Sequence, residues 1–127
     1  IVSIASDRPL VEAYHLMRDH GVRHLPVLDN GRLSGVVSWG DVRQVSAIDA
    51  RALTARAPQP TLIEECPVSE IMSRNPITVL PDTPMVQAAQ IMFEQAIGCL
   101  PVIESGRLTC IVTECDIFRM MILCQTV

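Results

Sequence analysis

The sequence of 127 residues contains no lysine, and aromatic side chains make up only 3% of it. Its 10 basic residues are therefore all arginines, and 14 acidic residues leave a net charge of −4. A protein that binds nucleic acid through a broad basic face needs clustered cations to displace counterions, so the composition argues against nucleic acid as a partner. With few aromatics, the core must be aliphatic, and a hydrophobic content of 49% supplies it.

Long apolar runs are also absent. No stretch reaches the roughly 18 residues needed to cross a bilayer, and no secretory leader is recognisable. We therefore expect a soluble, cytoplasmic protein without membrane insertion.

The cysteines lack any C-x-x-C spacing and are odd in number. They are Cys66, Cys99, Cys110, Cys115 and Cys124. Most lie among aliphatic neighbours, which favours reduced thiols that pack as small apolar side chains. A zinc site would need ligands from distant segments, including His15, His20 or His24, and we expect no metal.

An internal repeat dominates the chain: residues 1–45 align without a gap on residues 76–120. The 13 identities are Asp7/Asp82, Pro9/Pro84, Val11/Val86, Ala13/Ala88, Met17/Met92, Leu25/Leu100, Pro26/Pro101, Val27/Val102, Gly31/Gly106, Arg32/Arg107, Leu33/Leu108, Val37/Val112 and Asp41/Asp116. Such a repeat is one supersecondary unit copied, and two copies usually bury their apolar faces together. Function is therefore expected between the copies.

Each copy predicts the order β-α-β-β-α. A short β-branched run precedes Asp-x-Pro, which marks a helix start with a capping side chain and proline in the first turn. Apolar residues then recur at helical spacing, ending at Gly21 in the first copy and near Ala96 in the second. Asn30-Gly31 and Ser105-Gly106 predict two-residue hairpin turns, and Asp41 and Asp116 open a final helix.

The predicted domains are residues 1–57 for the first copy with its closing helix, 58–67 for a linker, and 68–127 for the second copy. The stretch from Ala47 to Ala57 should continue the closing helix, and Pro58-Gln59-Pro60 should be extended. Residues 68–72 have no counterpart before Ile1, so we expect the lead-in of the first copy to be missing from a fragment or disordered. What originally adjoined either end stays open.

These patterns resemble the cystathionine-β-synthase (CBS) domain. The resemblance rests on residues 68–79, on Gly98–Val102 with Gly106-Arg107-Leu108 and residues 111–117, and on residues 21–27 and 36–42 of the first copy. It implies an α/β fold of two pseudo-twofold-related units packed through their sheets, a tandem pair also called a Bateman module. It further implies a non-catalytic regulatory module that often forms a homodimer and binds AMP, ADP, ATP or S-adenosylmethionine between its units, with no required cofactor.

The same resemblance places two ligand sites. Site one combines Val22, Arg23, His24, Ser38 and Asp41 with Thr78, Val79 and Leu80 of the other copy. Site two combines Ile97, Gly98, Cys99, Thr113 and Asp116 with Ser3, Ile4 and Ala5. The aspartates would hold the ribose hydroxyls, the Ser or Thr hydroxyls would meet phosphate, and apolar residues would flank the adenine.

Spacing alone leaves another interpretation open, because Ser/Thr-x-x-Asp also forms a helix capping box. The two sites also differ in charge: Arg23 and His24 can neutralise phosphate, whereas Gly98 and Cys99 cannot. Site one is therefore expected to favour a phosphorylated ligand, and site two to be weaker, empty or suited to a less charged adenosine compound. For Arg23, a role as a solvated surface arginine is an equal alternative to phosphate binding. For His24, the equal alternative is a hydrogen-bonded structural histidine.

The leading hypothesis is a nucleotide sensor whose bound state is read by a fused or separate effector protein. Two other functions are alternatives to it. One is a ligand-free structural dimer, for which Met120–Leu123 on the last helix offers a face. The other is a hydrolase using Cys99 and His24, but no nucleophile motif or orienting group accompanies them. Trp39, the single tryptophan, either flanks the ligand or covers the sheet edge. The sequence leaves the regulated target and the dimer orientation undecided.

Overall fold

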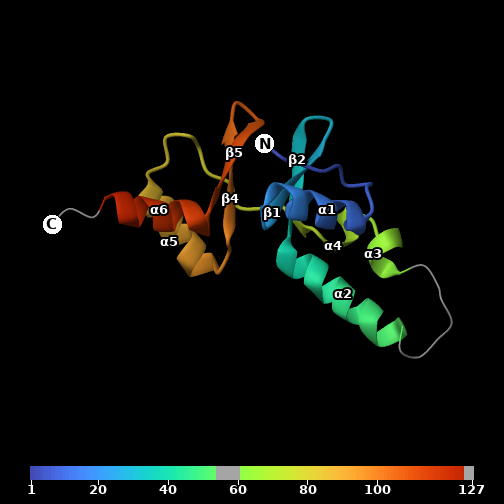
Figure 1. Cartoon of the computed structure of the whole chain (residues 1–127). Helices are drawn as coiled ribbons and strands as arrows, with labels where there is room; N and C mark the ends of the chain where they lie inside the picture. Colours follow the sequence, from blue (N-terminus) through green and yellow to red (C-terminus); the bar gives the residue numbers. More distant parts are fainter. Residues whose placement is uncertain (54–60, 125–127) are drawn as a thin grey trace. The chain divides into compact units, whose positions relative to one another are not determined.

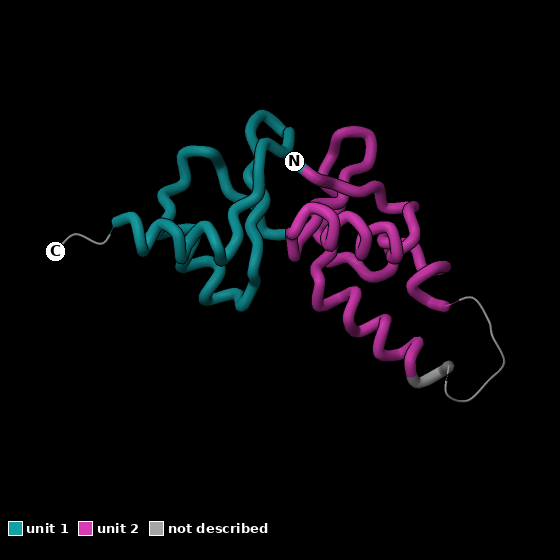
Figure 2. The backbone as a smooth tube through the Cα atoms, in the orientation of Figure 1, with its two compact units in different colours: residues 1, 76–127 teal, residues 2–75 magenta. Residues whose placement is uncertain are grey.

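The computed structural model describes residues 1–53 and 61–124, and the chain divides into two compact units (Figure 2). The N-terminal unit comprises Val2–Asn75 and is drawn in magenta. The C-terminal unit comprises Pro76–Val127 together with Ile1 and is drawn in teal. Each unit has its own hydrophobic core. The residues predicted to form an extended linker, Pro58-Gln59-Pro60, lie outside the described residues.

Among the described residues, the N-terminal unit contains four helices and a three-stranded antiparallel sheet in the order β1-β2-β3. Figure 1 labels the helices α1 to α4 and the strands β1 and β2 of this unit. The elements are α1 (Leu10–His20), β1 (His24–Asp29), β2 (Arg32–Ser38), α2 (Trp39–Leu53), α3 (Leu62–Glu65), α4 (Val68–Ile71) and β3 (Ser73–Arg74). The predicted first strand is reduced to one parallel bridge between Ile4 and Val27. The continuation of α2 predicted to reach Ala57 is described only as far as Leu53.

The C-terminal unit repeats the central part of this plan. Its elements are α5 (Met85–Gln95), β4 (Cys99–Glu104), β5 (Arg107–Thr113) and α6 (Glu114–Leu123). β4 and β5 form a two-stranded antiparallel sheet, and Val79 makes a parallel bridge to Val102. The mixed α/β class and the helix-hairpin-helix order predicted from the repeat are confirmed in both units.

The hairpin turns follow from left-handed backbone at both central residues. Asn30 and Gly31 have φ values of 52° and 77°, and Ser105 and Gly106 have 51° and 77°. Positive φ at both positions defines a type I′ turn, whose twist matches that of the flanking strands. The turns predicted from Asn-Gly and Ser-Gly are therefore confirmed.

The helix ends agree with the sequence only in part. Gly21 and Ala96 end α1 and α5 in the left-handed conformation, with φ of 65° and 52°. The predicted starts need correction: Pro9 and Pro84 occupy the capping positions themselves, and neither helix has a side-chain cap. Proline suits these places because it has no N–H to leave unpaired there.

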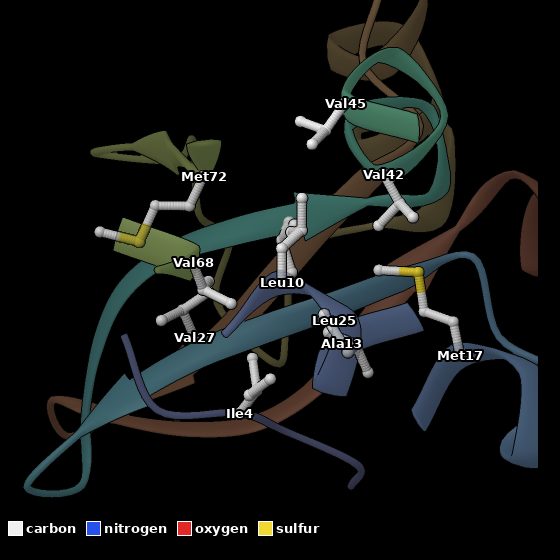
Figure 3. Packing of buried hydrophobic residues seen from close by; sticks show 11 residues of the cluster. Ile4, Leu10, Ala13, Met17, Leu25, Val27, Val42, Val45, Val68 and Met72 are labelled. Atoms are coloured by element: carbon white, nitrogen blue, oxygen red, sulfur yellow. The ribbon is translucent and has the colours of Figure 1, made fainter. Parts of the chain in front are cut away.

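The segment that leads into the second sequence repeat packs on the N-terminal unit. Val68 is fully buried and Met72 nearly so, in the same cluster as Leu10 and Val27 (Figure 3). The backbone adds to this, because β3 pairs with β2 and the N–H of Val68 donates to the carbonyl of Arg8. The second domain was predicted to start at residue 68, whereas the N-terminal compact unit ends at Asn75.

Within the described residues, no helix is both long enough and apolar enough to span a membrane.

Candidate functional site

The hydroxyl-Asp motif of the N-terminal unit lies where β2 passes into α2. The backbone N–H of Ser38 donates to Asp41 Oδ2 at 2.8 Å, and the N–H of Asp41 donates to Ser38 Oγ at 3.2 Å. These reciprocal bonds form a capping box, which satisfies N–H groups that the start of a helix leaves without intrahelical partners. The capping box that the Ser-x-x-Asp spacing allows is therefore formed by Ser38 and Asp41.

The C-terminal unit repeats this geometry between β5 and α6. Asp116 Oδ2 accepts from the N–H of Thr113 at 2.8 Å and from its hydroxyl at 3.2 Å. Asp116 Oδ1 lies 3.7 Å from an exposed nitrogen of Arg119. In both motifs the box uses Oδ2, so the carboxylate is held in a fixed position while Oδ1 takes no part in the box.

The residues before Leu25 lie beside the first motif. His24 is the cross-strand neighbour of Ser38, and the N–H of Trp39 donates to the carbonyl of Arg23 at 2.8 Å. Val22 and His24 are half-buried, and the side chain of Arg23 is exposed. The five site-one residues of the first copy therefore gather at one end of the β1-β2 hairpin.

The second motif has a different neighbourhood. Cys99 is the cross-strand neighbour of Thr113 and is buried, while Ile97 and Gly98 are half-buried. Burial, with a smaller contribution from the charge of Asp116, raises the pKa of the Cys99 thiol to about 11. The thiolate is the reactive form of cysteine, so this thiol is a poor nucleophile at neutral pH, which argues against the hydrolase.

The segments expected to complete each site alternate between buried and exposed residues. Ile4 and Val79 are buried in the cores of their own units, and each exchanges backbone hydrogen bonds with its own hairpin. Thr78 and Leu80 are exposed, and Ser3 and Ala5 are half-buried. Because side chains alternate along an extended segment, those flanking Ile4 and Val79 are the ones available for a ligand. That each segment joins the motif of the other copy stays a prediction.

Trp39 has a partner that the sequence did not indicate. Its ring stacks on that of Tyr14, with centroids 5.5 Å apart and planes inclined by 25°. The guanidinium group of Arg18 lies over the same Tyr14 ring, 5.6 Å from its centroid. Position 39 aligns with Glu114 in the second copy, so one motif contains an aromatic residue where the other contains an acid. The aligned repeat contains this difference, but only the structure places it next to the capping box.

Metal-binding side chains do not cluster in the described part of the chain, where no group of three or more His, Cys, Asp or Glu residues could hold an ion.

Comparison with known sequences identifies both units. The sequence model of the CBS domain matches residues 1–48 and 68–123. An inosine-5′-monophosphate dehydrogenase of Korarchaeum cryptofilum is 34% identical over 119 residues, which are 93% of this chain and 22% of that protein. A CBS domain-containing protein of Dictyostelium discoideum is 32% identical over 127 residues, which cover 96% of this chain and 85% of its own. The chain thus spans about a fifth of the dehydrogenase but most of the second relative.

Solved structures agree with the fold. A CBS-domain containing protein from Agrobacterium tumefaciens superposes with a TM-score of 0.80 at 23% identity, covering 95% of this chain and 89% of its own. The CBS domain pair of protein MJ0100, solved in complex with 5′-methylthioadenosine and S-adenosyl-L-methionine, gives 0.77 at 28% identity, covering 98% and 90%. The chain therefore belongs to the CBS domain family, and its two matched segments make it a pair of CBS domains.

Proposed function

We propose that this CBS pair is a regulatory module that binds adenosine-containing ligands at its two hydroxyl-Asp motifs and passes the bound state to a fused or separate effector. It would act as a homodimer and would catalyse no reaction itself. The observation that carries the proposal is the fixed carboxylate of Asp41, held by Ser38 beside the exposed Arg23. The adenosine ligands of the MJ0100 domain pair, at 28% identity, support the ligand class.

The capping box and the ligand site are compatible interpretations of the same residues. The box occupies Oδ2 of Asp41 and fixes the carboxylate at the start of α2. Asp41 Oδ1 could accept from the vicinal hydroxyls of a ribose, and backbone N–H groups at a helix start attract phosphate. An aspartate already held by its own helix needs no reorganisation to bind, which favours affinity.

The two proposed sites differ in the charge of the residues around them. Arg23 is exposed beside the first motif, and Arg43 is an exposed residue two positions after Asp41 on α2. A guanidinium group binds phosphate oxygens in a bidentate manner, so site one should favour AMP, ADP or ATP. The second motif carries Glu114 beside Asp116, which disfavours an anion and suits an uncharged or cationic adenosine compound such as S-adenosylmethionine.

The experiment uses Trp39, whose half-buried ring stacks on Tyr14 directly after Ser38. We would titrate its fluorescence with AMP, ADP, ATP and S-adenosylmethionine. A saturable change with a phosphorylated ligand is expected, and Arg23→Ala should weaken it by about tenfold, as for the loss of a charge-assisted contact. An unchanged affinity in Arg23→Ala would show that this arginine is a solvated surface residue.

Two matched variants separate ligand binding from capping. Asp41→Ala and Asp116→Ala each remove one capping box, with a similar loss of about 1 kcal/mol in the free energy of unfolding. Only Asp41→Ala should abolish the Trp39 response to AMP. If both variants, or neither, change that response, the assignment of site one to Asp41 is wrong.

A ligand-free structural dimer is the competing function. The observation in its favour is that the capping boxes already account for both aspartates without a ligand. It predicts dimers that form without nucleotide, and neither Trp39 fluorescence nor melting temperature would respond to any of the four compounds.

A further inference from the structure

The stack of Trp39 on Tyr14 joins the candidate site to helix α1. Trp39 directly follows Ser38 and precedes Asp41 by two positions, so it lies inside the hydroxyl-Asp motif. Its ring centroid is 5.5 Å from that of Tyr14. Both rings are half-buried and pack against the core of the N-terminal unit. Stacked rings at this separation attract each other beyond the area they bury, so the start of α2 is held to α1 by side chains.

Backbone hydrogen bonds complete a closed connection through the turn after α1. The N–H of Trp39 donates to the carbonyl of Arg23 at 2.8 Å, and the N–H of Val22 donates to that of Met17 at 3.0 Å. Tyr14 and Met17 are three positions apart on α1 and therefore lie on one face of it. The connection runs from α1 through the turn to the start of α2, and returns to α1 through the two rings. The turn that carries Arg23 is thus held from both sides.

The C-terminal unit lacks the ring part of this connection. Ala89 aligns with Tyr14, and Glu114 aligns with Trp39. The turn after α5 keeps the corresponding backbone hydrogen bond, also at 3.0 Å. Between α5 and α6, however, lies a groove of about 410 Å³ whose lining includes Ala89 and Glu114. Since this unit folds as a CBS domain without the rings, the fold alone does not require them.

We propose that Tyr14 and Trp39 are positioning residues for site one. Their stack holds the turn so that Arg23 stays beside Asp41, and the site thereby selects an adenosine ligand that carries phosphate. Arg23 aligns with Gly98, so the copy without the rings also has no cation to position. An arginine side chain loses rotational freedom when it binds, and a backbone that is fixed in advance lowers this cost. The inference rests on the proposed function and adds two residues that act on the ligand through Arg23.

The test measures AMP affinity by isothermal titration calorimetry, because the fluorescence of Trp39 itself would respond to loss of the stack. Tyr14→Leu is expected to weaken AMP binding by about fivefold, which corresponds to the ordering of one long side chain. Tyr14→Phe keeps a ring and should retain the wild-type affinity. Trp39→Leu breaks the stack from the other side, should give the same loss, and replaces Tyr14→Leu if that variant unfolds.

His15→Leu is the matched control on the same helix. The His15 ring also contacts that of Tyr14, at 5.5 Å, but it is tilted by 57° and lies outside the closed connection. This variant should leave the AMP affinity unchanged.

A double-mutant cycle with Arg23→Ala separates positioning from general stabilisation. If the stack acts through Arg23, Tyr14→Leu should cause no further loss of AMP affinity once Arg23 is alanine. Hydrogen exchange without ligand gives a second readout. The amide of Trp39, which donates to Arg23, should exchange at least about tenfold faster in Tyr14→Leu and at the wild-type rate in Tyr14→Phe.

Three results would overturn the positioning role and leave the proposed function intact. They are an AMP affinity that Tyr14→Leu does not change, losses that add in the double-mutant cycle, and an unchanged exchange rate of the Trp39 amide. A wild-type chain that binds no AMP would overturn the assignment of site one in the proposed function and this inference with it.

Discussion

Gly35 lies where β3 and Met72 come closest to β2. A methyl group at this position would stand 2.6 Å from the carbonyl oxygen of Ser73 and 2.8 Å from the sulfur of Met72. The carbonyl belongs to the backbone of a paired strand, so it cannot move without disturbing the β2-β3 ladder. The second copy has Cys110 at the aligned position, and β5 has no third strand beside it in the described residues.

Gly35→Ala is therefore expected to lower the free energy of unfolding by about 1–3 kcal/mol, through overpacking against Ser73 and Met72. Gly40→Ala is the matched control, since its added methyl group would lie 3.6 Å from Ser38 Oγ, an ordinary van der Waals contact. That substitution, inside α2, should change stability by less than about 1 kcal/mol, in the favourable direction. Urea unfolding measures both. If the two variants have the same free energy of unfolding, β3 shifts to accommodate the added methyl group at little energetic cost.

Asp29 ties the first hairpin to the N-terminal segment. It accepts from the Ser34 hydroxyl at 2.6 Å and from the N–H of Ser6 at 3.0 Å. The hydrogen bond from Ser34, followed by those from Ser6, lowers the pKa of this carboxyl group. A lowered folded-state pKa means that Asp29 stabilises the fold above its ordinary pKa near 4 and that this contribution is lost as pH falls through the folded value.

We expect Asp29→Asn to reduce the acid dependence of stability below about pH 4. Asp19→Asn is the control, since Asp19 forms an exposed pair with Arg18 that should contribute little. Melting temperatures between about pH 2 and pH 7 measure the effect. An Asp29→Asn profile parallel to that of the wild type would contradict the role of this carboxylate.

At the scale of elements, Asp49 connects α2 to the start of α3. Its side chain is buried, and its two oxygens accept from the N–H groups of Leu62 and Ile63 at 2.7 Å and 3.0 Å. α3 thus receives its cap from a residue of the preceding helix and not from Thr61, which makes no side-chain cap. The contact therefore fixes the start of α3 against α2.

Asp49→Ala should lower the free energy of unfolding by about 1–2 kcal/mol, because the N–H groups of Leu62 and Ile63 lose their buried carboxylate acceptor. Hydrogen exchange should accelerate first at the amides of Leu62 and Ile63. Asp49→Asn keeps one acceptor oxygen and should lie between the wild type and alanine. If exchange at these amides is the same in all three proteins, α3 does not depend on Asp49.

At the scale of the whole molecule, the two matched CBS segments and the two compact units have different boundaries. Val68 belongs to the second CBS segment by sequence, yet its side chain is fully buried among those of the N-terminal unit. The core of the C-terminal unit is assembled separately around Leu100, Val79 and Val102.

Val68→Ala should therefore destabilise the N-terminal unit by about 2 kcal/mol, as expected for truncation of a buried aliphatic side chain. Hydrogen exchange should accelerate at Leu25 and Val27 and stay unchanged at Leu100 and Val102. Val79→Ala is the reciprocal variant and should show the opposite pattern. Acceleration in the C-terminal unit on Val68→Ala would mean that residue 68 stabilises the second repeat, as the sequence boundary suggests.

Much of each unit was predictable because it depends on local chemistry. The helix-hairpin-helix order follows from apolar periodicity, and the turns follow from Asn30-Gly31 and Ser105-Gly106. The capping boxes follow from Ser/Thr-x-x-Asp spacing, and the CBS family follows from two copies of one pattern in order. The site residues of each copy were expected at the hairpin end because Ser38 and Thr113 end a strand and precede a helix.

Other features depend on contacts between segments that are distant in sequence. No local pattern indicates that Trp39 stacks on Tyr14, that Asp49 caps α3, or that Val68 and Met72 complete the core around Leu10. The exposure of Phe93 and Phe118 was likewise not predictable. Helical spacing places each on an apolar stripe but does not indicate whether another element covers that stripe.

The sequence by itself determined the repeat, the helix-hairpin-helix order of each copy, the turns and the residues that carry candidate chemistry, since these depend on neighbours within a few positions along the chain. Only the tertiary structure decided which surfaces each segment covers: α4 and β3 close the N-terminal unit, while α5 and α6 leave an apolar face in water. Burial depends on packing between distant segments, and spacing along the chain does not specify that packing.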